Sequence, residues 1–310
     1  MAIGIGQLAY ELPQTRCTVD ELRRAGLVRS EADVLREFGF ESVYIDHDQQ
    51  HGLRLAACRR VLEAGDVDPD DVEALLVYQG MQSSEVREPE DVLEFFRYPA
   101  ARLRAELGLA TASALGMSQQ GCSGLLTSIE LAARLLPSSP RRAVLCVAGD
   151  SLPPQSMREI MFNAMSDAAA ALLVEKDAAC NRIVHVMQRV HPYYWDSPIR
   201  QDELMASYFP IAQRTILECM DEAGLALSDI RWLVPHNVSR RSWEILARLL
   251  AFPEDRIWTK NIPRVGHTIS CDHVVNLVDM AAEGALRPGD KLLLFTFGFG
   301  ASWSCLVLEH

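Results

Sequence analysis

The chain has 310 residues, of which 49% are hydrophobic and 23% charged, and its formal net charge is −12. This composition supports a large packed core, as one big domain or two fused units. Such an acidic chain repels phosphate backbones, so we expect no nucleic-acid partner, although a local basic patch for a small acidic protein remains compatible with it. The eight cysteines are too few for a disulfide scaffold and lack zinc-ligand spacing, which favours a reducing cytoplasm and no metal.

The first residues have neither a basic region nor a long apolar run, so we expect no signal peptide. The longest apolar stretch, 292–308, is broken by two glycines and Ser302. It predicts two strands joined by a turn rather than a membrane span. We therefore expect a cytoplasmic protein that does not enter a membrane.

Pairs of distant segments follow the same plan. Residues 54–78 predict a helix ending in Glu-Ala-Gly, an acidic turn and a buried strand, and residues 212–236 repeat this order, with Glu-Ala-Gly again at the helix end. A second pair places a helix before a strand, at 121–148 and at 272–297. Helix–turn–strand units are common, but two matching pairs predict a duplicated α/β unit of about 150–160 residues.

The middle of the chain, 176–210, breaks this pattern. It carries Val-His-Pro-Tyr-Tyr-Trp at 190–195 and Tyr-Phe-Pro at 208–210. Aromatic residues and prolines outside a periodic element predict a loop that shapes a pocket, and a loop packed against the core fits equally well.

Cys122 is the first candidate for chemistry. It lies in Gln-Gly-Cys-Ser-Gly, ahead of a helix pattern with apolar residues at 125, 126, 129, 132, 135 and 136. The flanking small residues permit a tight turn and close approach of a substrate. The positive end of a helix dipole lowers the pKa of a thiol, so Cys122 is either a nucleophile or a buried structural cysteine.

Three later segments carry further candidates. His236 directly follows an apolar strand and a proline, at the strand end where ligands collect in α/β sheets, although a lone histidine is often structural. His267 and Asp272 precede another helix, and Asp272 either faces a site or caps that helix. The final Gly-Phe-Gly segment around Phe299 follows a strand, where a backbone N–H can point at a ligand as an oxyanion hole requires.

In their order and spacing, these segments resemble the ketoacyl synthase III branch of the thiolase superfamily. The likeness covers nearly the whole chain, and 162–171 resembles the family's Gly-Asp-Gly-Ala-Gly-Ala segment with small residues in place of glycine. The resemblance implies an α/β thiolase fold, with two duplicated halves and mixed sheets in five layers. We expect an N-terminal half at 1–174 with the nucleophile, a pocket-shaping insert at 175–210, and a C-terminal half at 211–310 with His236, His267 and Asp272.

The sequence departs from the family at His267, where typical members have asparagine. A Cys–His–His set implies decarboxylative condensation, with two imidazoles holding the thioester carbonyl. The Gly-His-x-x-x-x-Asp spacing of 266–272 is instead similar to that of family members in antibiotic pathways, which transfer an acyl group to a hydroxyl, an amine or another carrier. We favour acyl transfer, with condensation as the alternative and an inactive partner subunit of a heterodimer as the second alternative.

The resemblance also implies roles and partners. Cys122 would form the acyl-enzyme, the N–H groups of Cys122 and Phe299 would hold the oxyanion, and Asp272 would orient His236 as the base, with His267 on the acceptor or the carbonyl. No metal or organic cofactor is needed. The 31–41 segment lacks the tryptophan that stacks on coenzyme A in the family, which favours an acyl carrier protein as donor. The docking residues would be Arg240, Arg241 and Arg248, and a homodimer is expected.

Overall fold

The structure is a computed structural model that describes residues 2–47, 50–81, 92–153 and 155–310. Nine strands form one continuous mixed sheet that bends into two parts, in the order β11-β12-β13-β10-β1-β9-β6-β4-β5. The N-terminal part contains β1 (Ile3–Glu11), β9 (Ala168–Lys176), β6 (Ala143–Asp150), β4 (Val72–Gln79) and β5 (Ser113–Ser118). The C-terminal part contains β10 (Arg182–Val190), β13 (Ser302–Glu309), β12 (Lys291–Gly298) and β11 (Ile230–Pro235).

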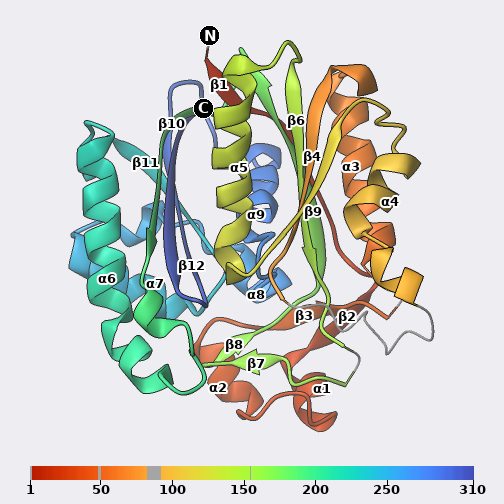
Figure 1. The fold of residues 1–310 in the computed structure, drawn as a ribbon. Helices are drawn as coiled ribbons and strands as arrows, with labels where there is room; N and C mark the ends of the chain where they lie inside the picture. Colours follow the sequence, from red (N-terminus) through yellow and green to blue (C-terminus); the bar gives the residue numbers. More distant parts are fainter. Residues whose placement is uncertain (1, 48–49, 82–91, 154) are drawn as a thin grey trace.

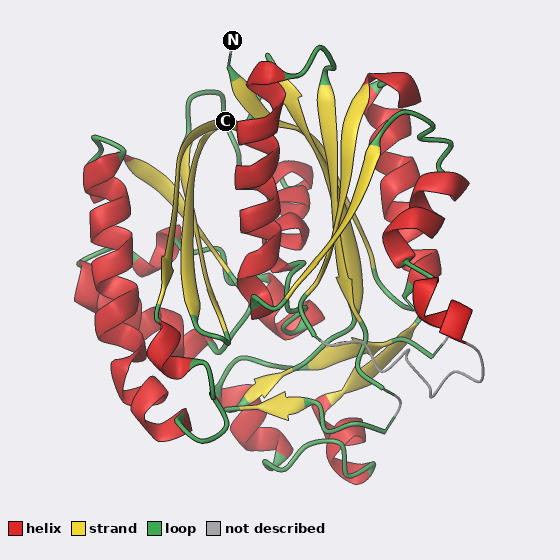
Figure 2. Cartoon of the chain, viewed as in Figure 1, coloured by secondary structure: helices red, strands yellow, loops and turns green. Residues whose placement is uncertain are grey.

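Helices lie on both outer faces and between the two parts of the sheet, so the molecule has five layers (Figures 1 and 2). The outer layer of the N-terminal part is α3 (His51–Gly65) with α4 (Pro99–Glu106). The middle layer is α5 (Gly124–Leu135) with α9 (Asp272–Ala282). The outer layer of the C-terminal part is α6 (Gln201–Glu222) with α7 (Arg240–Leu250). Three apolar cores fill the spaces between the layers, one under each outer layer of helices and one around the middle helices that reaches both parts of the sheet.

The two parts repeat one topology. In each, an outer helix and a 3-10 turn lead into a strand, α3 to β4 and α6 to β11. In each, a middle helix then leads into a second strand, α5 to β6 and α9 to β12. This second strand pairs in parallel with the first, β6 with β4 and β12 with β11. The duplicated thiolase fold predicted from the sequence is confirmed by this arrangement.

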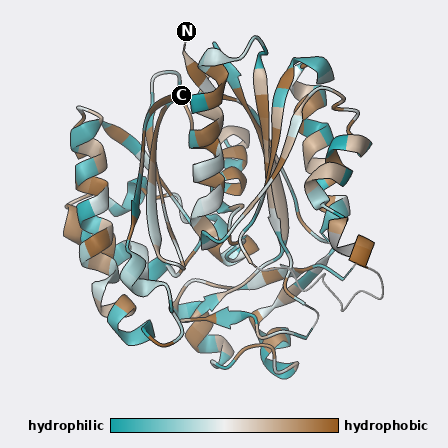
Figure 3. Cartoon of the chain, viewed as in Figure 1, coloured by the Kyte–Doolittle hydropathy of each residue, from teal (hydrophilic) through white to brown (hydrophobic). Residues whose placement is uncertain are grey.

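Alternating burial explains why the sheet needs helices on both sides. On β12, Leu292 and Leu294 pack into the middle core, whereas Leu293 and Phe295 pack into the outer core against α6 and α7. A strand buried on both faces has a nearly continuous apolar sequence, as this one does. Figure 3 shows hydrophilic and hydrophobic residues alternating along α6, which has one face on the sheet and one on solvent.

A small cap covers one end of the five layers (Figure 1). It contains the helices α1 (Val19–Arg24) and α2 (Ala32–Glu37) and two small antiparallel sheets. One pairs β2 (Thr15–Thr18) with β3 (Ser42–Ile45), on either side of the two helices in the chain, and the other is the hairpin of β7 (Glu159–Ile160) with β8 (Asn163–Ala164). A further short helix, α8 (Asn261–Val265), leads toward the segment that carries His267.

The prediction of an irregular segment at 176–210 is wrong over much of its length. Residues 182–190 form β10, which pairs with β13 and is the first strand of the C-terminal part. The helix predicted from 212 begins earlier, at Gln201, and contains Pro210. The sequence pattern had placed Pro210 at the end of a loop that precedes the helix. A proline normally breaks a helix, which is why the sequence pattern misplaced this boundary. Among the described residues, no helix is both long and apolar enough to cross a membrane.

Candidate active site

Cys122 lies in a 3-10 turn at Gly121–Ser123, directly before α5 in the middle layer. Gly121 has a φ of +50°, and a Cβ at this position would lie 2.6 Å from the backbone N of Phe299. Only glycine therefore allows the Cys122 turn to touch the end of β12. This contact brings the backbone N of Phe299 beside the cysteine turn, and both Cys122 and Phe299 line the same cavity.

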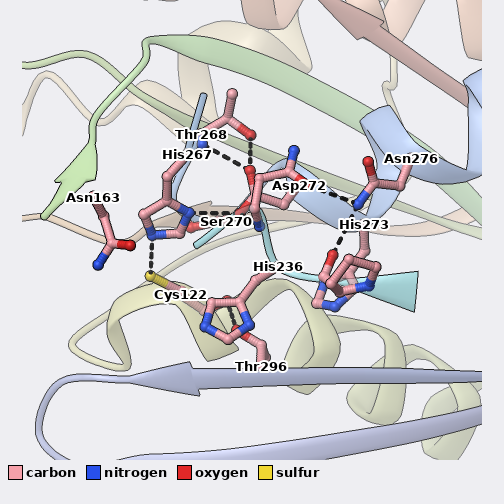
Figure 4. A network of polar contacts seen from close by, with 12 residues as sticks. Cys122, Asn163, His236, His267, Thr268, Ser270, Asp272, His273, Asn276 and Thr296 are labelled. Atoms are coloured by element: carbon pink, nitrogen blue, oxygen red, sulfur yellow. Dashed lines mark hydrogen bonds and ion pairs between the residues drawn. The ribbon is translucent and has the colours of Figure 1, made fainter. Parts of the chain in front are cut away.

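His267 connects the sulfur to a carboxylate. Its Nε2 lies 3.3 Å from the Cys122 Sγ, and its Nδ1 lies 2.6 Å from the Asp272 Oδ2 (Figure 4). The side chains of His267 and Asp272 are 6% and 0% exposed, so water does not screen this contact. Cys122, His267 and Asp272 therefore form a continuous chain of polar contacts.

Asp272 is held from several sides. Its Oδ1 accepts hydrogen bonds from the Thr268 N–H at 2.7 Å and the Thr268 hydroxyl at 2.6 Å, and its Oδ2 accepts one from the Asn237 N–H at 2.6 Å. Asp272 is the first residue of α9, but the partners of its carboxylate are His267, Thr268 and Asn237, which all precede the helix. The carboxylate therefore faces the site and does not cap the helix.

The sequence-based prediction that Asp272 orients His236 is wrong. Asp272 reaches the backbone N–H after His236, but its side-chain contact is with the His267 ring. The ring Nδ1 of His236 instead lies 3.3 Å from the Phe295 carbonyl oxygen. Local geometry explains the difference, because the 266–272 loop folds back on itself and brings His267 to a carboxylate only five positions away.

The two histidines differ in charge. Burial and the neighbouring His267 lower the pKa of His236 to about 3, so this ring is neutral near pH 7. Burial alone would also lower the pKa of His267, but the Asp272 carboxylate and the Cys122 sulfur outweigh it and raise this pKa well above its usual value. Burial opposes ionisation of Asp272, yet His267 and Thr268 still lower the pKa of its carboxyl.

The cavity above Cys122 has a volume of about 1010 Å³. His236 and His267 line it, as does Arg241 near the start of α7. The 195–209 segment contributes Trp195, Ser197, Pro198, Met205, Tyr208 and Phe209, so its predicted contribution to the pocket is confirmed although much of it is helical.

The three arginines predicted to dock a carrier protein are all exposed on α7. Arg240 and Arg241 are its first two residues, next to the cavity. Arg248 lies in the last turn, and its Nε is 3.5 Å from Glu254 Oε1. Of the three, Arg241 alone lines the cavity, and docking of a carrier protein remains a prediction.

Sequence reasoning missed two supporting groups. Thr268 donates twice to Asp272, and a signal for it existed, because a hydroxyl directly after His267 and four positions before a carboxylate is well placed for a local contact. Tyr78 donates its hydroxyl to the Gly121 carbonyl at 2.6 Å and so fixes the cysteine turn. Tyr78 lies on β4, far away in sequence, and no sequence signal indicated that contact.

Comparisons with known proteins agree with this fold. The family model for 3-oxoacyl-(acyl-carrier-protein (ACP)) synthase III, C terminal, matches residues 220–310. A curated relative, beta-ketoacyl-(acyl-carrier-protein) synthase III 3 of Streptomyces coelicolor, is 24% identical over 96% of this chain and 91% of its own.

Among solved structures, the acyltransferase ChlB3 has a TM-score of 0.86 and 22% identity, and the alignment covers 100% of this chain and 98% of that one. The priming beta-ketosynthase of the R1128 polyketide pathway has a TM-score of 0.80 and 21% identity, covering 99% and 96%. The chain is therefore similar to ketoacyl synthase III enzymes over nearly its whole length, its residues 220–310 match the C-terminal model of that family, and it has the thiolase fold.

Proposed function

We propose that the protein is an acyltransferase that moves an acyl group from a thioester donor, through an acyl-Cys122 intermediate, to a hydroxyl, an amine or another carrier. The observation that carries the proposal is the placement of His267 between the Cys122 sulfur and the Asp272 carboxylate. A base that is oriented by a carboxylate and lies beside the nucleophile can remove a proton from an incoming alcohol or amine.

In the first half-reaction, the Cys122 thiolate attacks the thioester carbonyl carbon. The N–H groups of Cys122 and Phe299 would hold the oxyanion. The C–S bond to the donor then breaks, and the departing thiolate takes the proton from the His267 imidazolium. Asp272 and the neighbouring sulfur raise the pKa of His267, so this proton is available on the ring.

In the second half-reaction, His267 is neutral, and the sulfur that helped to raise its pKa now carries an acyl group. Acylation of the sulfur lowers the pKa of His267 and makes the ring a weaker base, but Asp272 still orients it. It removes the proton of the acceptor O–H or N–H as the acceptor attacks the acyl carbon. The C–S bond to Cys122 breaks, and the thiolate and the imidazolium are restored.

His236 supports acyl transfer over condensation. Phe295 O is a carbonyl acceptor, so the neutral His236 ring is assigned its proton on Nδ1, which donates to that oxygen. Its Nε2 then carries a lone pair and can accept a hydrogen bond from an acceptor hydroxyl or amine. Condensation by two imidazoles instead needs an N–H donor at this position for the enolate oxygen.

Condensation is the second candidate, because the curated relatives carry the name beta-ketoacyl-(acyl-carrier-protein) synthase III. In that reaction a malonyl thioester would lose CO₂, and its carbanion would attack the acyl-Cys122 carbonyl. No proton would have to be removed from the attacking group. The carboxylate on His267 would then have no evident task.

The donor in this proposal is an acyl carrier protein thioester, with acyl-coenzyme A as the alternative. The exposed Arg240, Arg241 and Arg248 on α7 offer positive charge to an acidic carrier, and Arg241 does so at the cavity itself. The similarity to the priming ketosynthase of the R1128 polyketide pathway supports a role in secondary metabolism, and the similarity to ChlB3 supports acyl transfer. We further propose a cytoplasmic homodimer that uses a small-molecule acceptor and no cofactor.

The test uses the purified protein, loaded on Cys122 from acyl carrier protein thioesters and checked by intact mass. A panel of alcohols and amines is added to one sample and malonyl carrier protein to the other. Product formation without CO₂ release supports acyl transfer. Release of CO₂ that requires His267, and is lost in His267→Ala, supports condensation and contradicts the proposal.

A further inference from the structure

The turn between β7 and β8 has an unusual sequence for its shape. Glu159 pairs with Ala164 and Ile160 with Asn163, which leaves Met161 and Phe162 as a two-residue hairpin loop. Their φ values are +51° and +64°. Both residues are thus left-handed, a conformation that such loops normally give to asparagine and glycine because larger side chains strain the backbone there.

Contacts outside the turn hold it in this conformation. On one side, Glu159 accepts hydrogen bonds from the Ser30 hydroxyl at 2.6 Å and from the backbone N–H groups of Arg29 and Ser30. On the other, Asn163 Oδ1 accepts from the Ser239 N–H at 2.8 Å, while its Nδ2 donates to the Ile160 carbonyl at 3.0 Å. Strained backbone persists only where its surroundings fix it, and such places cluster at ligand-binding sites.

The strain places two large apolar side chains at the boundary between the cavity and solvent. Met161 and Phe162 both line the cavity that contains Cys122, and Phe162 is still 47% exposed. Its ring stacks on Phe38, the C-cap residue of α2, with centroids 4.9 Å apart and planes 5° from parallel. Phe38 lines the same cavity, so the stacked pair forms one wall of its opening.

We propose that Met161 and Phe162, backed by Phe38, form a fixed constriction that selects by girth which thioester donors reach Cys122. A cavity of about 1010 Å³ has room for bulky groups, so its opening can exclude what its interior would accept. The inference rests on the proposed function for the identity of the donors, whereas access to the Cys122 sulfur can be measured without any catalytic step.

The test compares alkylation of Cys122 by a slim reagent, iodoacetamide, and a bulky one, N-(1-naphthyl)iodoacetamide, followed by peptide mass. The variant Met161→Asn/Phe162→Gly gives the turn its preferred residues and removes both side chains. We expect the bulky-to-slim rate ratio to rise by about tenfold, a typical effect of pocket shape on selection. Its thermal unfolding midpoint should not fall, since the substitution relieves strain.

Two further variants complete the test. Phe162→Leu keeps the left-handed backbone but removes the ring, so its ratio should also rise. Phe96→Leu changes an exposed aromatic residue outside the cavity and should leave the ratio unchanged. If the ratio stays within about twofold of wild type in Phe162→Leu and in every folded turn variant, the constriction proposal is overturned. Because alkylation needs no acyl donor, failure of the acyltransferase proposal would instead appear as absent transfer with normal alkylation.

Discussion

The N-terminal and C-terminal parts of the molecule share one topology but carry different chemistry. Each sends the N-terminus of a middle helix toward the cavity, α5 from one part and α9 from the other. Before α5 the chain places the nucleophile, Cys122, and at the start of α9 it places the carboxylate, Asp272. After β11 it places His236, whereas after the matching strand β4 it has Gly80 and no ionisable side chain. Duplication thus supplied two equivalent positions, and the residues at them have different roles.

The largest effect is expected from removing the nucleophile, which the N-terminal part supplies. Cys122→Ala should abolish the acyl adduct and lower acyl transfer by about 10⁶-fold, the scale seen when a covalent nucleophile is removed. Intact mass after incubation with an acyl thioester measures the adduct. Cys17→Ala, which changes a partly exposed cysteine outside the cavity, is the control. An adduct that survives in Cys122→Ala would show that another residue is the nucleophile.

Acid should weaken the C-terminal part first. Folded His236 and His273 have pKa values of about 3 and about 4, both lowered mainly by burial, whereas an unfolded histidine titrates near its ordinary 6.5. Unfolding therefore takes up protons between these limits, and the free energy of unfolding should fall as the pH drops below about 6.5, by about 1.4 kcal/mol per pH unit for each proton. His267 has a raised pKa in the folded protein, so it behaves in the opposite way. Its contribution to the free energy of unfolding is full below pH 6.5 and is lost only as the pH rises through its folded-state pKa.

Urea unfolding between pH 7 and pH 4.5 measures this dependence. His273→Gln should flatten it by about one proton, whereas His47→Gln, at an exposed N-terminal position, should not change it. An unchanged slope in His273→Gln would contradict a buried neutral His273.

A smaller effect sharpens the role of the α9 start. Thr268→Val removes the hydroxyl that donates to Asp272 at 2.6 Å and keeps the backbone N–H. The pKa of the Asp272 carboxyl should rise, and acyl transfer should fall by about tenfold, as expected for losing one hydrogen bond to a charged group. Thr268→Ser keeps the hydroxyl and is the control. Equal rates in Thr268→Val and wild type would mean that this bond does not support the base.

Much of the fold could be predicted from the sequence, because the order of its helices and strands depends on local signals. Helix, turn and strand follow one another in both parts as periodicity and glycine positions indicated. The strand β10 was not predicted, because the aromatic residues and proline after Val190 are typical of a loop. The start of α6 was not predicted, because Pro210 lies inside that helix and a proline usually marks a helix boundary.

The site was predicted in its members but not in its connections. The resemblance to ketoacyl synthase III implied that Cys122, His236, His267 and Asp272 act together, and the structure places them close to one another. Which histidine Asp272 contacts depends on how the 266–272 loop turns back, and residue type alone does not determine this. The Phe38–Phe162 stack joins residues more than a hundred positions apart, so no local pattern could indicate it.

The most direct test of the account is the fate of acyl-Cys122 in Asp272→Asn. This substitution keeps the shape of the side chain and removes the charge that orients His267. We predict that Cys122 still becomes acylated, because a thiol remains a strong nucleophile, while transfer to an alcohol or amine falls by up to about 10⁴-fold. Intact mass should therefore show an acyl-enzyme that persists after the acceptor is added. An acyl-enzyme that disappears at the wild-type rate would contradict the role of Asp272 and His267.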